Sequence, residues 1–256
     1  MIERIIGVIL KSEQLSQFEK DLEEFSITLS SEQIDQFLKY YEMLVEKNKV
    51  MNLTATTEFD EVLKKHFIDS LSLIKVCNLR EMMSVIDVGT GAGFPGIPLK
   101  IVFPNLKLTL LDSLQKRVFF LQEVSEALGL YDVEAVHGRA EDFAKPDQMR
   151  EKFDLCVSRA VANLSTLSEY CLPYVKIGGK FVSYKSEKVF MNSGQNLTEA
   201  DQAEHAITVL GGKMTEQKSF FLPSSNISRT FIVIEKCRPT PKQYPRKAGT
   251  ASKKPL

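Results

Sequence analysis

The sequence predicts an α/β fold: a mostly parallel sheet with helices on both faces, preceded by a helical cap. Three observations lead to this prediction. A short apolar run at 84–88 has the β-forming residues of a buried strand and leads directly into a glycine-rich loop. Beyond that loop, predicted strands and helices alternate, which favours a parallel sheet. Only a short loop separates the last two predicted strands, so we expect them to form an antiparallel pair at the sheet edge.

The first 80 residues are expected to be helical. Residues 12–47 have apolar residues at helical spacing, and Ser30 and Gln33 within them have the spacing of a capping box. A turn-prone stretch follows, after which Thr57 is expected to cap a further helix that includes His66. We therefore predict a helical cap at 1–80, an α/β domain at 81–237 and a basic tail at 238–256.

The α/β domain is expected to have seven strands and four helices. Pro95 suits the first position of the helix after the glycine loop, where no amide donor is needed. The predicted strands are 84–88, 106–111, 132–136, 153–158, 179–184, 213–221 and 229–235, and the helices lie near 95–103, 115–128, 163–176 and 195–210.

The glycine-rich loop predicts a ligand at the carboxyl end of the first strand. A dinucleotide fingerprint requires a third glycine where Phe94 stands, which disfavours a dehydrogenase. The second strand ends in Asp112, whose carboxylate can accept hydrogen bonds from ribose hydroxyls. This pattern fits a nucleoside without a pyrophosphate, such as S-adenosylmethionine (SAM), whereas an ordinary strand-to-helix turn is the alternative. The loop residues concerned are Asp87, Gly89, Gly91 and Gly93.

Polar residues at the ends of later strands are further candidates. Ala140 and Glu141 follow the third strand and could meet an adenine ring, although acids are also common at ordinary helix starts. Arg159 ends the fourth strand, where it could bind a carboxylate or phosphate or be a plain surface residue. Lys185 ends the fifth strand and points toward the same rim. His66 fits a packed helix residue as well as a functional one.

Composition excludes several classes of protein. The chain has 256 residues, with 33 Lys and Arg against 33 Asp and Glu, so its net charge indicates no particular partner. No run approaches the ~18 apolar residues of a membrane span, and the first ten residues do not resemble a signal peptide. The four cysteines form no Cys-x-x-Cys pair, so we expect no disulfide framework or zinc site and a reducing cytosol.

Cations gather at the C-terminus. A basic tail is typical of binding to nucleic acid, and a solvated, disordered end is the alternative. After Glu235 the chain has no acidic residue, and its cations are Lys236, Arg238, Lys242, Arg246, Lys247, Lys253 and Lys254.

Several of these motifs together resemble one family. They are Asn52-Leu-Thr, His66-x-x-Asp69-Ser70, the loop from Asp87 to Pro98, Leu111-Asp-Ser113 with Lys116-Arg117, Ser158-Arg159-Ala160 and Arg229-Thr-Phe-Ile-Val-Ile. Over about residues 30–236 the chain resembles the RsmG family, also called GidB, whose members are 16S ribosomal RNA guanine-N7 methyltransferases. Residues 241–249 resemble an extension found in a subset of that family, whereas the residues up to Lys11 have no counterpart that we recognise.

The resemblance implies the Rossmann-like, seven-stranded fold of class I SAM-dependent methyltransferases, with an N-terminal helical cap. It also implies SAM as cofactor and 16S rRNA of the small ribosomal subunit as partner, without metal or membrane, in the cytoplasm. We expect a monomer, although the sequence leaves the oligomeric state open. The expected cofactor residues are Asp87, Gly89, Gly91, Gly93, Phe94, Asp112, Ser113, Ala140, Glu141 and Arg159, and the expected catalytic or RNA-facing residues are Asn52, His66, Arg159, Lys185 and Arg229.

The expected target explains why the sequence needs no catalytic triad. Guanine N7 carries a free lone pair at neutral pH, so a general base is not required, and positioning supplies most of the acceleration. Two other functions remain open at this point. The chain could be a SAM-dependent methyltransferase of another substrate, or a non-catalytic module that binds during ribosome assembly.

Overall fold

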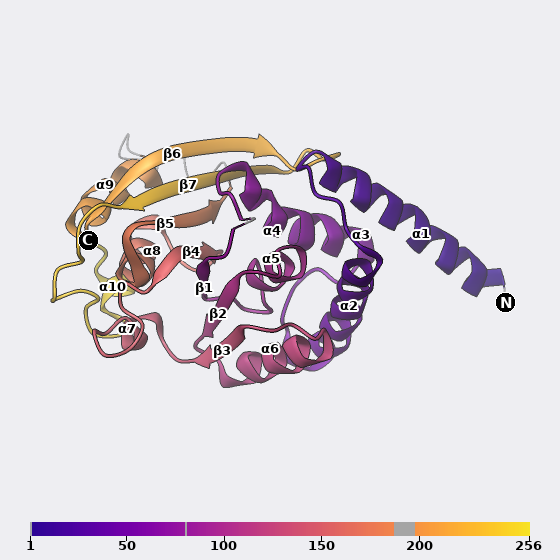
Figure 1. Ribbon diagram of the computed structural model, residues 1–256, viewed down its shortest axis with the longest axis horizontal. Helices are drawn as coiled ribbons and strands as arrows, with labels where there is room; N and C mark the ends of the chain where they lie inside the picture. Colours follow the sequence, from indigo (N-terminus) through magenta and orange to yellow (C-terminus); the bar gives the residue numbers. More distant parts are fainter. Residues whose placement is uncertain (1, 80, 187–197) are drawn as a thin grey trace.

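A seven-stranded sheet forms the centre of the protein (Figure 1). The computed structural model describes residues 2–79, 81–186 and 198–256, with side chains from Ser12 onward. Along the sheet the strand order is β3-β2-β1-β4-β5-β7-β6. The strands are β1 (Ser84–Val88), β2 (Lys107–Asp112), β3 (Val133–His137), β4 (Phe153–Arg159), β5 (Val175–Lys185), β6 (Gly212–Phe221) and β7 (Ser228–Lys236).

Six of the seven strands run in the same direction and one, β7, is reversed. Strands β1 to β5 pair in parallel, whereas β7 lies antiparallel to both β5 and β6. The predicted antiparallel pair is therefore confirmed, with β6 at the edge and β7 inside it. The strand order reverses between β1 and β4, and in open α/β sheets ligands bind beyond the carboxyl ends of strands at such a point.

Helices cover both faces of the sheet, as expected. Side chains alternate along β1, so that Val85 packs toward one hydrophobic cluster and Ile86 toward the other. On one side lie α1 (Ile2–Glu23), α2 (Ser31–Met51), α3 (Phe59–Val62), α4 (Asp69–Leu71), α5 (Gly96–Val102) and α6 (Gln115–Ala127); on the other lie α7 (Ala140–Phe143), α8 (Leu164–Cys171) and α9 (Glu199–Val209), followed by α10 (Thr250–Lys253) (Figure 1).

The helical cap shares its core with the sheet. Phe37 and Tyr40 of α2 lie in the same hydrophobic cluster as Val85 of β1. The Tyr40 hydroxyl donates a 2.6 Å hydrogen bond to the carbonyl of Ala92, within the glycine loop. Because this contact joins cap to loop directly, the cap positions the loop as well as covering one sheet face.

Two details of the cap differ from the sequence-based expectation. The segment 12–47 is not one helix, because the chain leaves α1 after Glu23 and Ser26 takes a left-handed conformation at φ 55°. The capping box at Ser30 and Gln33 is confirmed and begins α2. Thr57 does not cap the next helix; Glu58 precedes α3 without a side-chain hydrogen bond. Ser30 starts α2, whereas apolar spacing alone does not reveal where α1 ends.

The helix that carries His66 is irregular. After α3 the chain forms a π-helical turn over Leu63–Ile68, then α4, then a 3₁₀ turn over Ser72–Lys75. π-helical turns are rare overall, but many of those that occur lie at functional sites. They shift side chains out of the regular helical positions. Here the shift affects Lys65 and His66 at the rim of the sheet.

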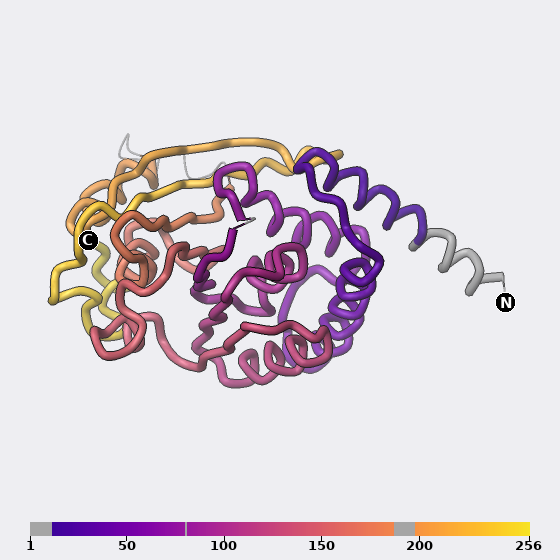
Figure 2. The backbone as a smooth tube through the Cα atoms, viewed as in Figure 1, coloured from indigo at the N-terminus to yellow at the C-terminus, as the bar shows by residue number. Residues whose placement is uncertain are grey.

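The basic tail is folded against the body of the protein. Figure 2 shows the C-terminal segment, in yellow, beside α7 and α8. Ala251 is buried there, which contradicts the alternative of a solvated, disordered end. The predicted helix near 195–210 is Glu199–Val209, and residues 195–197 lie outside the described part of the chain. Among the described residues, no helix is long and apolar enough to cross a membrane, and no group of three metal-binding side chains occurs.

Candidate functional site

Two cavities lie side by side at the carboxyl ends of the central strands. The first, which we call the glycine-loop cavity, has a volume of about 280 Å³, close to the lower end of typical ligand pockets. It is formed by the ends of β1 and β2, the residues after β3 and β4, α8 and the C-terminal segment. Its lining includes Val88, Gly89, Leu111, Asp112, Ser113, Gly138, Arg139, Ala140, Glu141, Val161, Tyr170, Gly249 and Ser252.

Asp112 is held in place at the floor of the glycine-loop cavity. Its Oδ2 accepts a 2.9 Å hydrogen bond from the Gly91 amide, and its Oδ1 accepts one of 2.9 Å from the Leu114 amide. Arg117 adds a weak ion pair at 3.4 Å. A carboxylate has about four lone-pair sites, so Asp112 keeps acceptor capacity for ribose hydroxyls while its orientation is fixed.

The glycine loop leaves space that a side chain would fill. Gly89 and Gly91 have φ of +72° and +65°, a conformation that glycine adopts without strain. A Cβ atom at Gly89 would lie 2.5 Å from Val161, whereas one at Gly91 would meet no atom within 4 Å. The open space beside Gly91 allows a ligand to approach the backbone closely.

Asp87 supports the loop from beneath. It is fully buried, and its Oδ2 accepts hydrogen bonds from the Thr90 hydroxyl at 2.7 Å and the Gly96 amide at 2.9 Å. Burial raises the pKa of this carboxyl to about 7. Asp87 therefore ties the start of the loop to the start of α5, and it does not line either cavity.

The second cavity, which we call the arginine cavity, has a volume of about 490 Å³. It lies between the irregular helix, the ends of β4 and β5, and the start of β7. The residues around it are rich in cations. They are Thr56, Lys65, His66, Asp69, Arg159, Ala160, Tyr184, Lys185, Ser186 and Arg229.

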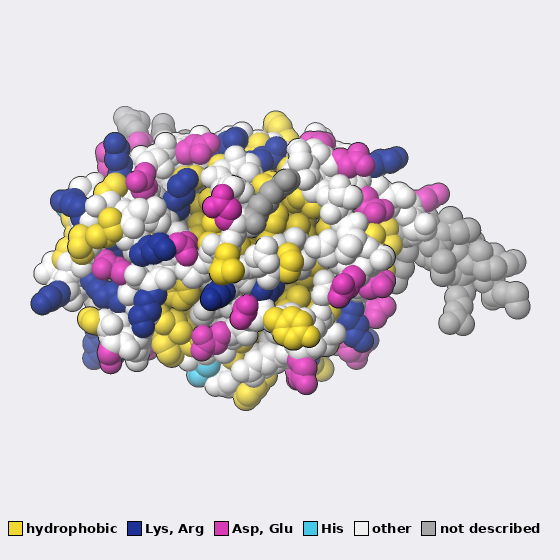
Figure 3. Space-filling model, in the orientation of Figure 1, with side chains coloured by type: hydrophobic (Ala, Val, Ile, Leu, Met, Phe, Trp, Pro, Cys, Tyr) yellow, Lys and Arg dark blue, Asp and Glu magenta, His cyan; other side chains and the backbone are white. Residues whose placement is uncertain are grey.

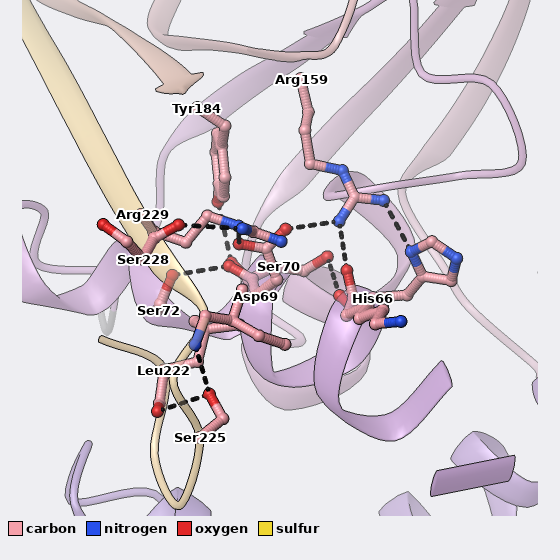
Figure 4. A network of polar contacts seen from close by, with 12 residues as sticks. His66, Asp69, Ser70, Ser72, Arg159, Tyr184, Leu222, Ser225, Ser228 and Arg229 are labelled. Atoms are coloured by element: carbon pink, nitrogen blue, oxygen red, sulfur yellow. Dashed lines mark hydrogen bonds and ion pairs between the residues drawn. The ribbon is translucent and has the colours of Figure 1, made fainter. Parts of the chain in front are cut away.

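Asp69 connects two arginines in the arginine cavity (Figure 4). Its Oδ2 pairs with Arg159 Nη1 at 2.8 Å, and its Oδ1 pairs with Arg229 Nε at 2.8 Å. The Asp69 side chain is only 3% exposed, so solvent screens both ion pairs weakly. Arg159 also donates to the Lys65 carbonyl at 3.1 Å, which fixes the plane of its guanidinium group.

His66 is neutral and has both ring nitrogens engaged. Arg159 Nη2 lies 3.2 Å from Nδ1 and can only donate, so Nδ1 accepts and the proton sits on Nε2. Nε2 then donates to Thr54 Oγ1 at 2.8 Å. Burial, reinforced by repulsion from Arg159, lowers the pKa of His66 to about 3. The ring also stacks on Phe94, with centroids 4.6 Å apart, so contacts at both nitrogens and on one ring face fix its orientation.

The remaining predicted polar residues have different surroundings. Lys185 Nζ bonds to Glu199 Oε1 at 2.7 Å and to the Ala162 carbonyl at 2.8 Å, at the rim of the arginine cavity. Asn52 is exposed and forms the left-handed C-cap of α2 at φ 48°, which asparagine tolerates well. Asn52 does not line either cavity, so its expected role toward RNA stays a prediction.

The structure divides the predicted cofactor residues between three places. The arginine cavity holds Arg159, with Phe94 beneath it 5.1 Å from the guanidinium carbon. Gly93 faces the helical cap, where an added Cβ would lie 2.7 Å from the Tyr40 hydroxyl. The residues that meet in the glycine-loop cavity are Gly89, Asp112, Ser113, Ala140 and Glu141, with Gly91 joined to them through Asp112.

One turn separates the two cavities. Ala160 lines the arginine cavity and the next residue, Val161, lines the glycine-loop cavity. Ala160 has φ +57°, an uncommon value for a residue with a side chain, and such backbone strain clusters at functional sites. A group bound in one cavity therefore lies next to a group bound in the other.

Sequence reasoning missed several residues of the site. The sequence places Asp69 within a motif and on the same helix as His66, but it does not reveal that Asp69 orients two arginines. Its position three residues from His66 on a largely apolar helix face was an available signal. Tyr184 and Ser252 give no local signal, because their roles depend on segments far away in the sequence. Thr54 belongs to the Asn52-Leu-Thr motif, but only the structure shows its contact with His66.

Comparison with known proteins identifies the family. A sequence model of the GidB family, described as "rRNA small subunit methyltransferase G", matches residues 33–226. The chain belongs to the GidB family. Another protein, "Ribosomal RNA small subunit methyltransferase G" of Alkaliphilus metalliredigens, is 53% identical over 234 residues, which cover 91% of this chain and 95% of that one.

Further relatives are similar over nearly their whole length. A Bacillus cereus protein of the same name is 49% identical over 242 residues, covering 94% of this GidB-family chain and 98% of the relative. Among solved structures, a SAM-dependent methyltransferase from Aquifex aeolicus matches with a TM-score of 0.51 and 18% identity, over 75% of this chain and 98% of that one. This similarity shows that the fold is that of a class I SAM-dependent methyltransferase.

Proposed function

We propose that the protein transfers the methyl group of SAM to N7 of a guanine in 16S rRNA of the small ribosomal subunit. The observation that best supports this is the shared wall between the two cavities at Ala160 and Val161. One cavity suits a nucleoside and the other suits an anionic, planar partner. GidB-family membership and the printed names of the relatives favour the same substrate class.

The residues of the glycine-loop cavity fit SAM. Asp112 offers fixed acceptor sites for ribose hydroxyls, and Glu141 offers a buried carboxylate for an exocyclic amine. Open space beside Gly91 lets the ligand approach the backbone. When bound, SAM supplies an electrophilic methyl group on its sulfonium.

The residues of the protein then act by positioning the guanine and the cofactor. Guanine N7 needs no deprotonation, and His66 could not readily act as a base, because both of its ring nitrogens are engaged and its pKa is about 3. Arg159 has five N–H donors, of which the described contacts take three. Its guanidinium can meet guanine O6 or a phosphate while Asp69 holds it in place.

The cations around the arginine cavity would hold the RNA backbone. Lys65, Lys185 and Arg229 surround it, and charge of this kind makes binding to RNA fall with salt. Asn52 and the exposed lysines of the tail are further candidates for RNA contacts. We expect the protein to act as a monomer in the cytoplasm, where small ribosomal subunits are assembled.

The test measures methyl transfer from tritiated SAM to small ribosomal subunits that lack the modification. Reduction and aniline cleavage then locate N7-methylguanine, and we expect label at a single guanine of 16S rRNA. SAM binding without label in any RNA would contradict the proposal and favour a non-catalytic assembly module. Label in a protein or small molecule would favour another substrate.

A variant pair links the activity to the arginine cavity. Arg159→Lys keeps the charge but loses the planar fork that meets Asp69, Lys65 and His66 together, so we expect kcat/KM to fall about 10- to 100-fold. Lys213→Arg on β6, at the far edge of the sheet, is the matched control and should leave kcat/KM unchanged.

A further inference from the structure

The C-terminal arm, which we define as residues 238–256, is anchored to the body of the protein by buried polar contacts. Arg246 pairs with Glu169, a fully buried carboxylate on α8, through its Nε at 3.0 Å and its Nη2 at 2.5 Å. The Arg246 backbone amide donates to the same carboxylate at 2.8 Å. A buried charge pair of this kind holds the arm in one place.

A second anchor lies nearer the start of the arm. Arg150 donates to the carbonyls of Thr240 and Tyr244 at 2.5 and 2.7 Å. At the other end, the Thr166 hydroxyl of α8 donates to the carbonyl of Ala251 at 3.1 Å. The arm is thus fixed on both sides of residues 246–250, where it passes the glycine-loop cavity.

The arm forms part of the wall of that cavity. Gly249 and Ser252 both line it, together with the residues that follow β2 and β3. The Gly249 amide donates a 2.8 Å hydrogen bond to Glu141 Oε1. Gly249 has φ +80°, so the turn that directs this amide inward suits glycine in particular. Glu141 is itself only 8% exposed, which makes the bond hard for water to replace.

We propose that the C-terminal arm is a cofactor-binding element, in which the Gly249 amide positions Glu141 for the adenine amine and Ser252 closes the adenine side of the cavity. This inference rests on the proposed function, because it takes SAM as the ligand of the glycine-loop cavity. A carboxylate that accepts one fixed N–H bond keeps further lone pairs for a ligand donor. The arm therefore sets the affinity for the nucleoside.

The cations of the arm suggest a role in RNA binding, and the residues that carry them differ from those that contact the glycine-loop cavity. Arg246 is engaged with Glu169, whereas Lys253 and Lys254 are exposed. On the face shown in Figure 3, Lys and Arg side chains gather toward the end where Figure 1 places the C-terminal segment. Exposed lysines would act on RNA through charge, while Gly249 acts on the cofactor through its backbone.

Deleting residues 248–256 tests the proposal, because it removes Gly249 and Ser252 and keeps both arginine anchors. Calorimetry with SAM and with S-adenosylhomocysteine should show dissociation constants about tenfold higher than in the full chain, as expected for a lost hydrogen bond and an opened wall. Lys253→Gln with Lys254→Gln is the control and should change neither constant. Constants within twofold of the full chain, in a folded deletion variant, would overturn the proposal.

Two further variants extend the test, and the first of them needs no deletion. Ser252→Leu keeps every anchor and should weaken cofactor binding severalfold by intruding into the cavity. Glu141→Gln should weaken binding in the full chain and have a smaller effect after the deletion, because the Gly249 amide acts on the ligand through Glu141. Fully additive effects would contradict a role through Glu141. A full chain that bound neither ligand would instead refute the proposed function.

Discussion

Asp69 and Arg159 form a 2.8 Å ion pair that joins the helical cap to the end of the fourth strand. The carboxylate is almost fully buried and pairs at the same time with Arg229 of β7. Three segments of the chain thus meet at one acidic side chain. Two guanidinium groups lie close together only because this carboxylate offsets their mutual repulsion, which gives the arginine cavity its charge and its shape.

Replacing Asp69 should destabilise the protein. Asp69→Asn leaves both arginines without their anionic partner in a largely buried place, so we expect the free energy of unfolding to fall by about 3 kcal/mol. Urea denaturation measures the change. Asp147→Asn, at an exposed position, is the matched control and should change it by less than 0.5 kcal/mol, roughly the usual surface value. A loss below about 1 kcal/mol in Asp69→Asn would contradict the importance of the pair.

His66 should make stability increase with pH in the acid range. Its pKa is about 3 in the folded protein and 6.5 in the unfolded chain, so between these values only the unfolded state binds a proton. The stability of the wild type relative to His66→Gln should therefore rise by about 1.4 kcal/mol per pH unit in that window. Urea denaturation from pH 4.5 to 6.5 measures this, with His205→Gln as the exposed control. A difference independent of pH would show that His66 titrates normally.

Asp87 should have the opposite effect. Its pKa is raised to about 7 in the folded protein from 3.8, so between these values the folded state holds the extra proton. Relative to Asp87→Asn, the wild type should lose stability as pH rises from 4 to 7, by about 1.4 kcal/mol per unit at most. Asp35→Asn, which is exposed on α2, provides the control. His66 and Asp87 act in opposite directions, so the stability of the wild type plotted against pH would show neither effect clearly. A stability difference between wild type and Asp87→Asn that rises with pH would refute the assignment for Asp87.

The exposed lysines of the C-terminal arm should contribute to RNA binding without affecting the cofactor. The slope of log binding constant against log salt concentration should become less steep by up to about 3 when four exposed lysines are replaced by Gln, since each phosphate contact contributes ~0.7. These lysines are Lys242, Lys247, Lys253 and Lys254. Filter binding to 16S rRNA at saturating S-adenosylhomocysteine measures the slope. The control replaces two exposed lysines by Gln, Lys107 as the first residue of β2 and Lys152 just before β4, and should leave the slope unchanged. An unchanged slope would remove the arm from the RNA interface.

Much of the sheet could be predicted because most of its strands contain short apolar runs that stand between helical patterns. All seven predicted strands lie within a few residues of those observed, and β5 shows the largest difference, since it begins at Val175 instead of 179. Strand β5 begins early because Val175 pairs with Phe153 of β4, and no local sequence pattern predicts this pairing. Helix ends in the cap were less predictable, because the break at Ser26 depends on packing beyond the local sequence.

The class of fold, the glycine loop and the acid at Asp112 follow from the amino-acid sequence alone, because they depend on residues close together in the chain and on backbone conformations that few residues allow. Which polar side chains act together became visible only in the folded chain. Asp69 meets Arg159 and Arg229 from 90 and 160 residues away, and Glu141 meets Gly249 across 108. Such pairs form because the sheet order and the docking of the arm bring distant segments together. The free energy that stabilises them comes from the burial of residues that lie far apart in the sequence.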